Sequence, residues 1–327
     1  MSEIPAQFQN LPLARYRIVL HTATAAILPA IIGSTLRGAF GHALKAISCC
    51  VPHQDCKICF LSEVCLYTTV FEPTAPKLKD APRPFIFEPP IPPLTNELSQ
   101  NSTLKLLISE NGKISFDLIL IGEAIRKMPY FIYALELMAR HGLGAERQPF
   151  AVSEVFTINS DDSPELIYAS GQLKVLPHRT SNLGEQVETV LAKITPSENL
   201  RISFPTPLRI NRQRQILEKV SFTEFFKQCS LRIKFLSENY GQPVEYDYQT
   251  LMTKTENIRI VSENLWRHNF QRWTNRRSRH EPLDGMLGKI EYGGDSLKEF
   301  LPFVIAGSIL HIGNSTSFGL GQFKIDA

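Results

Sequence analysis

The sequence has no uninterrupted apolar run of the length that a membrane-spanning helix requires, about 18 to 20 residues. Its first residues also lack the basic stretch and apolar core of a secretory signal peptide. These two absences argue against a membrane-spanning or secreted protein. We therefore expect a cytoplasmic protein that has no membrane partner.

The sequence has no excess of one charge either, since 35 Lys and Arg residues face 32 Asp and Glu residues. Net charge therefore does not indicate nucleic-acid binding, and only the positions of the basic residues can support that inference.

At 327 residues the chain is long enough for two domains, each with its own core.

Cysteine is scarce outside one segment, because five of the six cysteines lie between Cys49 and Cys65. In a reducing compartment such a cluster predicts a metal site rather than disulfides. Cys56 and Cys59 form a C-x2-C pair, and Cys65 with either Cys49 or Cys50 completes a set of four thiolates. We predict a structural zinc ion. An iron–sulfur cluster would use the same thiolates, and a reduced loop without metal is the third reading.

In the first half of the chain, segments with the hydrophobic pattern of a strand alternate with segments that have the pattern of a helix. A proline-dense connection from Glu72 to Leu94 excludes helix there. Asn111 and Gly112 predict that the two strands around them form a hairpin. The expected elements are a strand at 15–22, a helix at 31–47, strands at 102–108 and 113–121, a helix at 125–140 and a strand at 150–158.

The second half repeats this order. Ser221 and Glu224 form a capping box that predicts a helix to about Asn239. Strands are expected at 200–210 and 287–292, a helix from 296 to about 311, and a strand that returns through Phe318 to Ile325. Each half approximates β-α-β-β-α-β. We therefore predict an α+β fold of two tandem ferredoxin-like domains, at 1–180 and 197–327, joined around 177–196, with the cysteine segment inserted in the first.

A glycine loop follows the helix expected to end near His311. Gly313, Gly319 and Gly321 let the backbone adopt positive φ and present unhindered N–H groups, which suits contact with phosphate. An ordinary helix-to-strand turn has the same pattern. The helix expected to end near His141 is followed in the same way by glycines, at positions 142 and 144.

A basic group lies between Trp266 and His280. Arginines interleaved with aromatic residues offer both phosphate forks and stacking faces, which suits single-stranded or hairpin RNA. The alternative is a solvated strand face whose tryptophans belong to the core. The arginines of this group are Arg267, Arg272, Arg276, Arg277 and Arg279.

The first expected helix contains LRGAFGHALK. Gly38 and Gly41 lower helix propensity within a helical pattern, which often means that something approaches the backbone closely. Arg37, His42 and Lys45 place two cations and an imidazole on the same helix. A single histidine on a helix is nevertheless often an ordinary surface or core residue.

Together these blocks resemble a known family. LRGAFGHALK, CLYTTVFEP after the cysteines, HGLGAERQPF, RWTNRRSRHEPLDGMLGKIEYGGD and LPFVIAGSILHIGNSTSFGLGQFKI are similar to the CRISPR-associated endoribonucleases that process precursor CRISPR RNA, within the RAMP superfamily. The last block is the most specific. It matches the glycine loop of that family through Gly307, His311, Gly313, Ser317, Phe318, Gly319, Leu320 and Gly321.

The resemblance implies two ferredoxin-like domains and an RNA substrate held by the basic group and the glycine loop, with Gly313, Ser315, Ser317, Gly319 and Gly321 as loop contacts. It implies metal-independent cleavage of CRISPR repeat RNA to mature guide RNA, in which the ribose 2′-hydroxyl attacks the adjacent phosphate and leaves a 2′,3′-cyclic phosphate. Such chemistry needs a base, an acid and cations for the charged intermediate. His42 occupies the place of the general base, with Lys45 and Arg37 as candidates for phosphate stabilisation.

Other assignments stay open at this point. His141, His280 and His311 compete with His42, and Tyr16 is a further candidate for orienting substrate. Some RAMP proteins bind CRISPR RNA without cutting it, so a non-catalytic subunit that partners with other effector-complex subunits is the alternative function. A third reading is a zinc-stabilised ferredoxin-like protein with no role in RNA.

Overall fold

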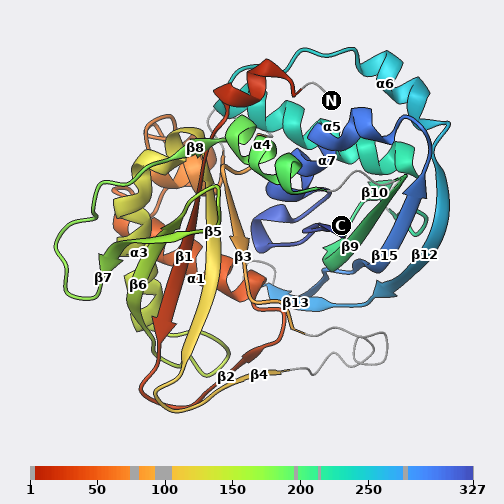
Figure 1. The fold of residues 1–327 in the computed structure, drawn as a ribbon. Coiled ribbons are helices and arrows are strands. Elements are labelled where there is room, and N and C mark those ends of the chain that lie inside the picture. The colour runs from red at the N-terminus through yellow and green to blue at the C-terminus, as the bar shows by residue number, and fades with distance from the viewer. Residues whose placement is uncertain are drawn as a thin grey trace.

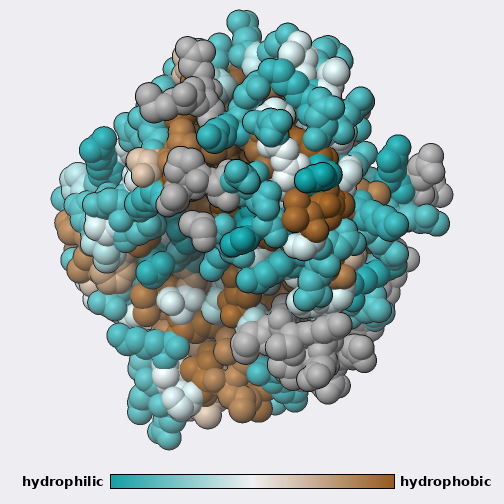
Figure 2. All heavy atoms as spheres, turned by 45° about the vertical axis from the view of Figure 1, so that its right-hand side comes forward, coloured by the Kyte–Doolittle hydropathy of each residue, from teal (hydrophilic) through white to brown (hydrophobic). Residues whose placement is uncertain are grey.

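The computed structural model describes residues 4–73, 81–92, 105–194, 198–212, 215–274 and 279–326. These residues form two large antiparallel sheets with their helices, the amino-terminal half on the left of Figure 1 and the carboxy-terminal half on the right, and three two-stranded sheets, β2-β4, β10-β11 and β13-β14. Among the described residues, no helix combines the length and apolar character that a bilayer-spanning segment needs. On the face in Figure 2, hydrophobic side chains reach the surface as patches between hydrophilic ones.

The amino-terminal sheet has the strand order β3-β5-β1-β6-β7, with β8 paired to β1. Its elements in chain order are β1 (Pro12–His21), β2 (Ala26–Pro29), α1 (Gly33–Ser48), β3 (Phe85–Glu88), β4 (Lys105–Ile108), β5 (Lys113–Ile121), α3 (Met128–His141), β6 (Ala151–Ile158), β7 (Pro164–Ala169) and β8 (Ser181–Asn182). Short turns of helix add η1 (Ala6–Asn10), η2 (Cys56–Ile58), η3 (Tyr67–Phe71) and η5 (Gly122–Lys127).

The carboxy-terminal sheet has the order β12-β15-β9-β16. Its elements are α4 (Leu183–Lys193), β9 (Asn199–Leu208), β10 (Asn211–Arg212), β11 (Gln215–Ile216), α5 (Phe222–Tyr240), α6 (Tyr248–Thr255), β12 (Arg259–His268), β13 (Gln271–Thr274), β14 (Arg279–Pro282), β15 (Gly285–Gly293), α7 (Leu297–Leu310), η6 (Thr316–Phe318) and β16 (Lys324–Asp326). In each half the first and third strands of the β-α-β-β-α-β unit are central. This order confirms the predicted tandem ferredoxin-like fold.

The two halves share apolar packing across the amino-terminal sheet. Because strand side chains alternate between faces, Tyr16 and Ile18 of β1 pack on the side of α1 and α3. Leu13 of β1, with Ile86 and Ile119 from neighbouring strands, belongs instead to the core that contains α5 and α7. The carboxy-terminal half is therefore fixed against one face of the amino-terminal sheet.

The predicted hairpin between the two strands around Asn111 is wrong. β5 pairs with β1, whereas β4 pairs with β2. The β2–β4 pairing continues the register of the β1–β5 pairing: His21 lies opposite Lys113, and Ala26 lies opposite Ile108. The turn at Asn111, whose φ is 56°, therefore bends one long two-stranded ribbon, which extends toward the bottom of Figure 1. An Asn-Gly pair indicates a turn, but it does not show that the chain reverses onto itself.

The predicted last strand is shorter than its alternating pattern suggested. β16 begins only at Lys324, and Phe318 ends the short turn η6. Gly319 and Gly321 have φ of 85° and 70°, which a strand does not accommodate. The proline-dense connection, in turn, contains β3, whose four residues are all buried.

Candidate functional site

The first helix and the last loop of the chain meet. A Cβ atom on Gly33, at the start of α1, would lie 1.9 Å from the carbonyl oxygen of Phe318. The Arg37 guanidinium carbon lies 4.3 Å from the ring centroid of Phe71 and 4.9 Å from that of Phe318. Cation–π attraction thus joins α1 to the glycine loop.

The three predicted catalytic residues have different surroundings. His42 is exposed and has no hydrogen-bond or ion-pair partner in the described part of the chain. Lys45 is half-buried, and its Nζ lies 5.5 Å from the centroid of the Tyr67 ring. Arg37 lies between two rings. His42 is therefore the predicted catalytic side chain that faces solvent directly.

Gly38 and Gly41, in the middle of α1, also differ. A Cβ atom on Gly41 would lie 2.1 Å from Cζ of Phe71, so this glycine admits an aromatic ring. A Cβ atom on Gly38 would meet nothing within 4 Å among the residues that the structure describes. Because Gly38 and His42 are four residues apart, they share one face of the helix. The helix surface next to His42 is therefore open.

The glycines of the last loop approach the protein's own backbone. A Cβ atom on Gly321 would lie 1.8 Å from the carbonyl oxygen of Ile312, and one on Gly319 would lie 2.6 Å from that of Phe87. Ser317 is buried. The predicted RNA contacts of this loop that reach the surface are the half-buried Gly313 and Ser315.

Within the basic group, Arg267 is held by two acids. Its Nη2 lies 2.6 Å from Oδ2 of the buried Asp284, and its Nη1 lies 3.1 Å from Oε1 of Glu218. The hydrogen bond to Asp284 raises the pKa of Arg267. Arg272 and Arg279 lie on the paired strands β13 and β14, although their side chains fall outside the described atoms. Arg276 and Arg277 lie outside the described residues.

The other candidates for a role in catalysis differ in how deeply their side chains are buried. Tyr16 is fully buried, and its hydroxyl lies 2.9 Å from Nε2 of His178. Burial raises the pKa of Tyr16. Because its side chain is enclosed by the core, we do not assign it to substrate. His141 is exposed at the end of α3, the side chain of His280 is outside the described atoms, and His311 is fully buried.

A polar row that the sequence reasoning missed crosses the amino-terminal sheet on the face toward the carboxy-terminal half. Glu88 and Arg17 each stand opposite Asp117 across neighbouring strands. Arg15 Nη2 lies 3.1 Å from Glu88 and 2.8 Å from Asp117. Charged residues that alternate with buried ones on a strand are ordinary, so the sequence signal was only Glu88 at the end of an apolar strand.

The cysteine segment shows five free thiols, exposed or half-buried. Burial raises the pKa of Cys56, while the nearby charge of Lys45 acts in the opposite direction. Within the described ranges, no group of three or more His, Cys, Asp or Glu side chains is placed to hold a metal ion. The zinc site stays a prediction.

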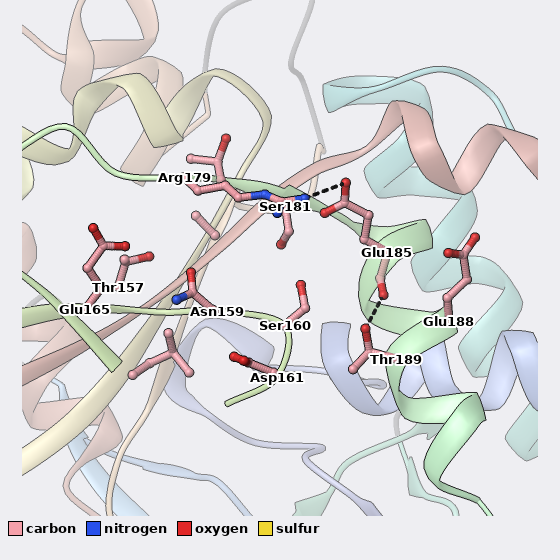
Figure 3. Close-up of a pocket in the computed structure, with 13 residues that line it drawn as sticks. Thr157, Asn159, Ser160, Asp161, Glu165, Arg179, Ser181, Glu185, Glu188 and Thr189 are labelled. Carbon is pink, nitrogen blue, oxygen red and sulfur yellow. Dashed lines mark hydrogen bonds and ion pairs between the residues drawn. The ribbon is translucent and has the colours of Figure 1, made fainter. Parts of the chain in front are cut away.

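A pocket of about 580 Å³ lies elsewhere, between the end of β6, the turn after it and α4 (Figure 3). Its wall carries Asp161, Glu165, Glu185 and Glu188, and Arg179 lies 3.5 Å from Glu185. None of the predicted site residues belongs to this wall. Because these carboxylates repel phosphate, we place the candidate site at α1 and the glycine loop.

Comparison with known proteins agrees with this architecture. An uncharacterised protein of Archaeoglobus fulgidus is 23% identical over 308 residues, which cover 91% of this chain and 92% of that protein. The fold is similar to that of Thermus thermophilus Cas6, with a TM-score of 0.53 and 13% sequence identity; the match covers 97% of this chain and 99% of that chain. A structure described as a partial Cas6-RT-Cas1–Cas2 complex gives a TM-score of 0.59 at 12% identity, over 97% of this chain and 46% of that one. These structures support the fold.

Family models place the chain more directly. Residues 11–180 match a model described as an N-terminal domain. Residues 202–323, which include the basic group and the glycine loop, match the model of the CRISPR-associated endoribonuclease Cas6. The chain is therefore Cas6-like: its carboxy-terminal half matches the Cas6 family model, and its fold is similar to that of Cas6 structures.

Proposed function

We propose that this chain cleaves CRISPR repeat RNA to release mature guide RNA, without using a metal ion. The observation that carries the proposal is the position of His42. It is exposed and unpartnered among the described residues, beside the open surface at Gly38, on a helix whose other end touches the glycine loop. The match of residues 202–323 to the Cas6 endoribonuclease model supports the reaction class and the substrate class.

In the proposed reaction, His42 takes the proton of the ribose 2′-hydroxyl. The 2′-oxygen then bonds to the adjacent phosphorus, the bond from phosphorus to the 5′-oxygen breaks, and that oxygen receives a proton. The products are a 2′,3′-cyclic phosphate and a 5′-hydroxyl. Histidine suits both proton transfers, because an ordinary imidazole titrates at about pH 6.5.

Lys45 is the better candidate for stabilising the charged intermediate. It lies three residues after His42, and its flexible stem lets the ammonium group leave the Tyr67 ring for a phosphate. Arg37 lies between two rings, so we assign it to holding α1 against the glycine loop.

One observation favours the alternative, a non-catalytic RAMP subunit that binds CRISPR RNA within an effector complex. Arg37 and Lys45, the cations closest to His42 in the sequence, both lie against aromatic rings. If neither moves, His42 would lack these two partners for the phosphate.

The test is cleavage of end-labelled repeat RNA by the purified chain, with EDTA and separately with Mg²⁺. We expect one cut of equal rate in both, and a cyclic phosphate on the upstream product. His42→Ala should reduce the single-turnover rate by about 10²- to 10⁴-fold, as loss of a general base does. His141→Ala, which removes another exposed histidine, is the control. Binding without cleavage by the wild-type chain would favour the alternative, and cleavage by His42→Ala would remove His42 from the mechanism.

A further inference from the structure

A buried ionic contact joins the two halves at the start of the glycine loop. Nε2 of His311, the residue after α7, lies 2.9 Å from Oε1 of Glu88 at the end of β3. His311 is fully buried, and Glu88 is nearly so. Gln322 donates to the same carboxylate oxygen at 3.2 Å, and Arg15 lies 3.1 Å from the other oxygen.

Both ring nitrogens of His311 face acceptors. Nδ1 lies 3.2 Å from the carbonyl oxygen of Leu320, on the far side of the loop, and Nε2 faces Glu88. A neutral imidazole has a single N–H donor. Burial alone would raise the pKa of Glu88, but His311, Arg15 and Gln322 together hold it below its usual value. The carboxylate is therefore ionised, and the ring of His311 lies between it and the Leu320 carbonyl, with one nitrogen within hydrogen-bond distance of each.

The backbone of His311 is strained, with φ of 55° and ψ of 151°. This region of backbone space is occupied readily by glycine alone, and other residues remain there only when their surroundings hold them. The loop has four other positive-φ positions, which are Gly313, Gly319, Gly321 and Ser315, and Ser315 lies in the less restricted left-handed helical region. A side chain kept at position 311 in spite of the strain, and hidden from any substrate, indicates a role in positioning.

We propose that the Glu88–His311 pair is a positioning pair that fixes the glycine loop on the amino-terminal sheet. This inference rests on the proposed function, because its consequence is that Gly313 and Ser315 are held at a set place relative to His42. Arg37 fixes the loop from α1, and Glu88 fixes it from β3. Through Nδ1, the same ring contacts the carbonyl oxygen of Leu320 on the far side of the loop.

The first experiment needs no RNA. Amide hydrogen exchange of residues 312–322 is measured in the full-length wild type, His311→Gly, Glu88→Ala and Glu88→Gln. His311→Gly relieves the backbone strain. If His311 served only to form the turn, this variant would therefore leave the exchange rates of residues 312–322 unchanged. We expect exchange at least about tenfold faster in His311→Gly and Glu88→Ala. Glu88→Gln should exchange more slowly than Glu88→Ala, because its amide can donate to a neutral imidazole.

His141→Gly is the matched control, since it alters an exposed histidine before the corresponding loop of the other half, and it should leave residues 312–322 unchanged. Unchanged exchange in His311→Gly, or equal exchange in Glu88→Gln and Glu88→Ala, would overturn the proposal.

The second experiment follows cleavage of repeat RNA at increasing enzyme concentration under single-turnover conditions. A displaced loop should raise the half-saturating concentration of Glu88→Ala by about tenfold and leave the rate at saturation within about threefold, because His42 is untouched. A loss confined to the saturating rate would contradict the proposal. Absence of cleavage by the wild type would defeat the proposed function, while the exchange experiment would still decide the role of the pair.

Discussion

Gly38 and Gly41 are three residues apart in α1, and their different surroundings allow packing to be separated from exposure. A Cβ atom on Gly38 would enter open space, whereas one on Gly41 would enter the ring of Phe71. That ring stacks on Phe85 and Tyr67 and lies under Arg37. It therefore has no room to retreat.

We expect the two alanine variants to differ in sign. Gly38→Ala should raise the free energy of unfolding by about 0.5–1 kcal/mol, because alanine loses less backbone entropy in a helix. Gly41→Ala should lower it by about 1–3 kcal/mol through overpacking. Urea unfolding of both variants beside the wild type measures the difference, and each variant is the control for the other. Equal effects would show that the ring of Phe71 moves freely.

Single residues of the site were only partly predictable. The sequence drew attention to His42 through a motif, and the structure leaves it exposed. The burial of Tyr16 and His311 could not be predicted, because periodicity places a residue on an element and does not reveal what covers it. Arg37 illustrates the same limit, since its second aromatic partner, Phe318, comes from the other end of the chain.

Strands and helices were more predictable than their partners. The repeated β-α-β-β-α-β order sufficed for the tandem fold, because both sheets place their first and third strands centrally. The predicted N-cap at Ser221 was confirmed, since the Ser221 hydroxyl accepts from the Glu224 N–H at 3.3 Å, while the Glu224 carboxylate accepts from Arg212. Pairing depends on contacts distant in sequence, so the bend at Asn111 was mistaken for a hairpin.

For the cysteine segment we propose a structural zinc ion bound by Cys56, Cys59, Cys65 and either Cys49 or Cys50. Purified protein should then contain about one zinc ion per chain. Cys59→Ser, or prolonged chelation, should release the metal and lower the thermal midpoint by at least about 5 °C, since about 1 kcal/mol moves the midpoint of a domain of this size by 2–4 °C.

Cys49→Ser and Cys50→Ser, compared side by side, identify the fourth ligand as the one whose loss releases zinc. Iron and visible absorption in the purified protein would instead indicate an iron–sulfur cluster in place of zinc. If the purified protein contains no metal and Cys59→Ser has the same thermal midpoint as the wild type, the segment is a reduced loop without metal.

The two halves depend on each other through more than one contact. Leu13, Ile86 and Ile119 of the first half lie in the core of the second. The Tyr240 hydroxyl donates to the carbonyl oxygen of Pro82 at 2.5 Å. Glu88 adds a buried carboxylate to this boundary, held ionised by His311 and Arg15. Protonating that carboxylate should therefore weaken the boundary between the halves.

The pH dependence follows from the direction of the Glu88 pKa. This pKa is lower in the folded chain than in the unfolded chain, so the ionised carboxylate stabilises the fold above an unfolded value of about 4.3. That stability is lost as the pH falls through the lower, folded pKa. Urea unfolding between pH 7 and pH 3 should show Glu88→Gln less stable than the wild type at pH 7 by about 1–3 kcal/mol, the range for losing hydrogen bonds to a charged group. The difference should shrink as the pH falls below about 4.3, since the unfolded wild-type chain then binds a proton at Glu88 that the folded chain binds only at lower pH. A difference that stays constant from pH 7 to pH 3 would mean that Glu88 contributes through its shape rather than its charge.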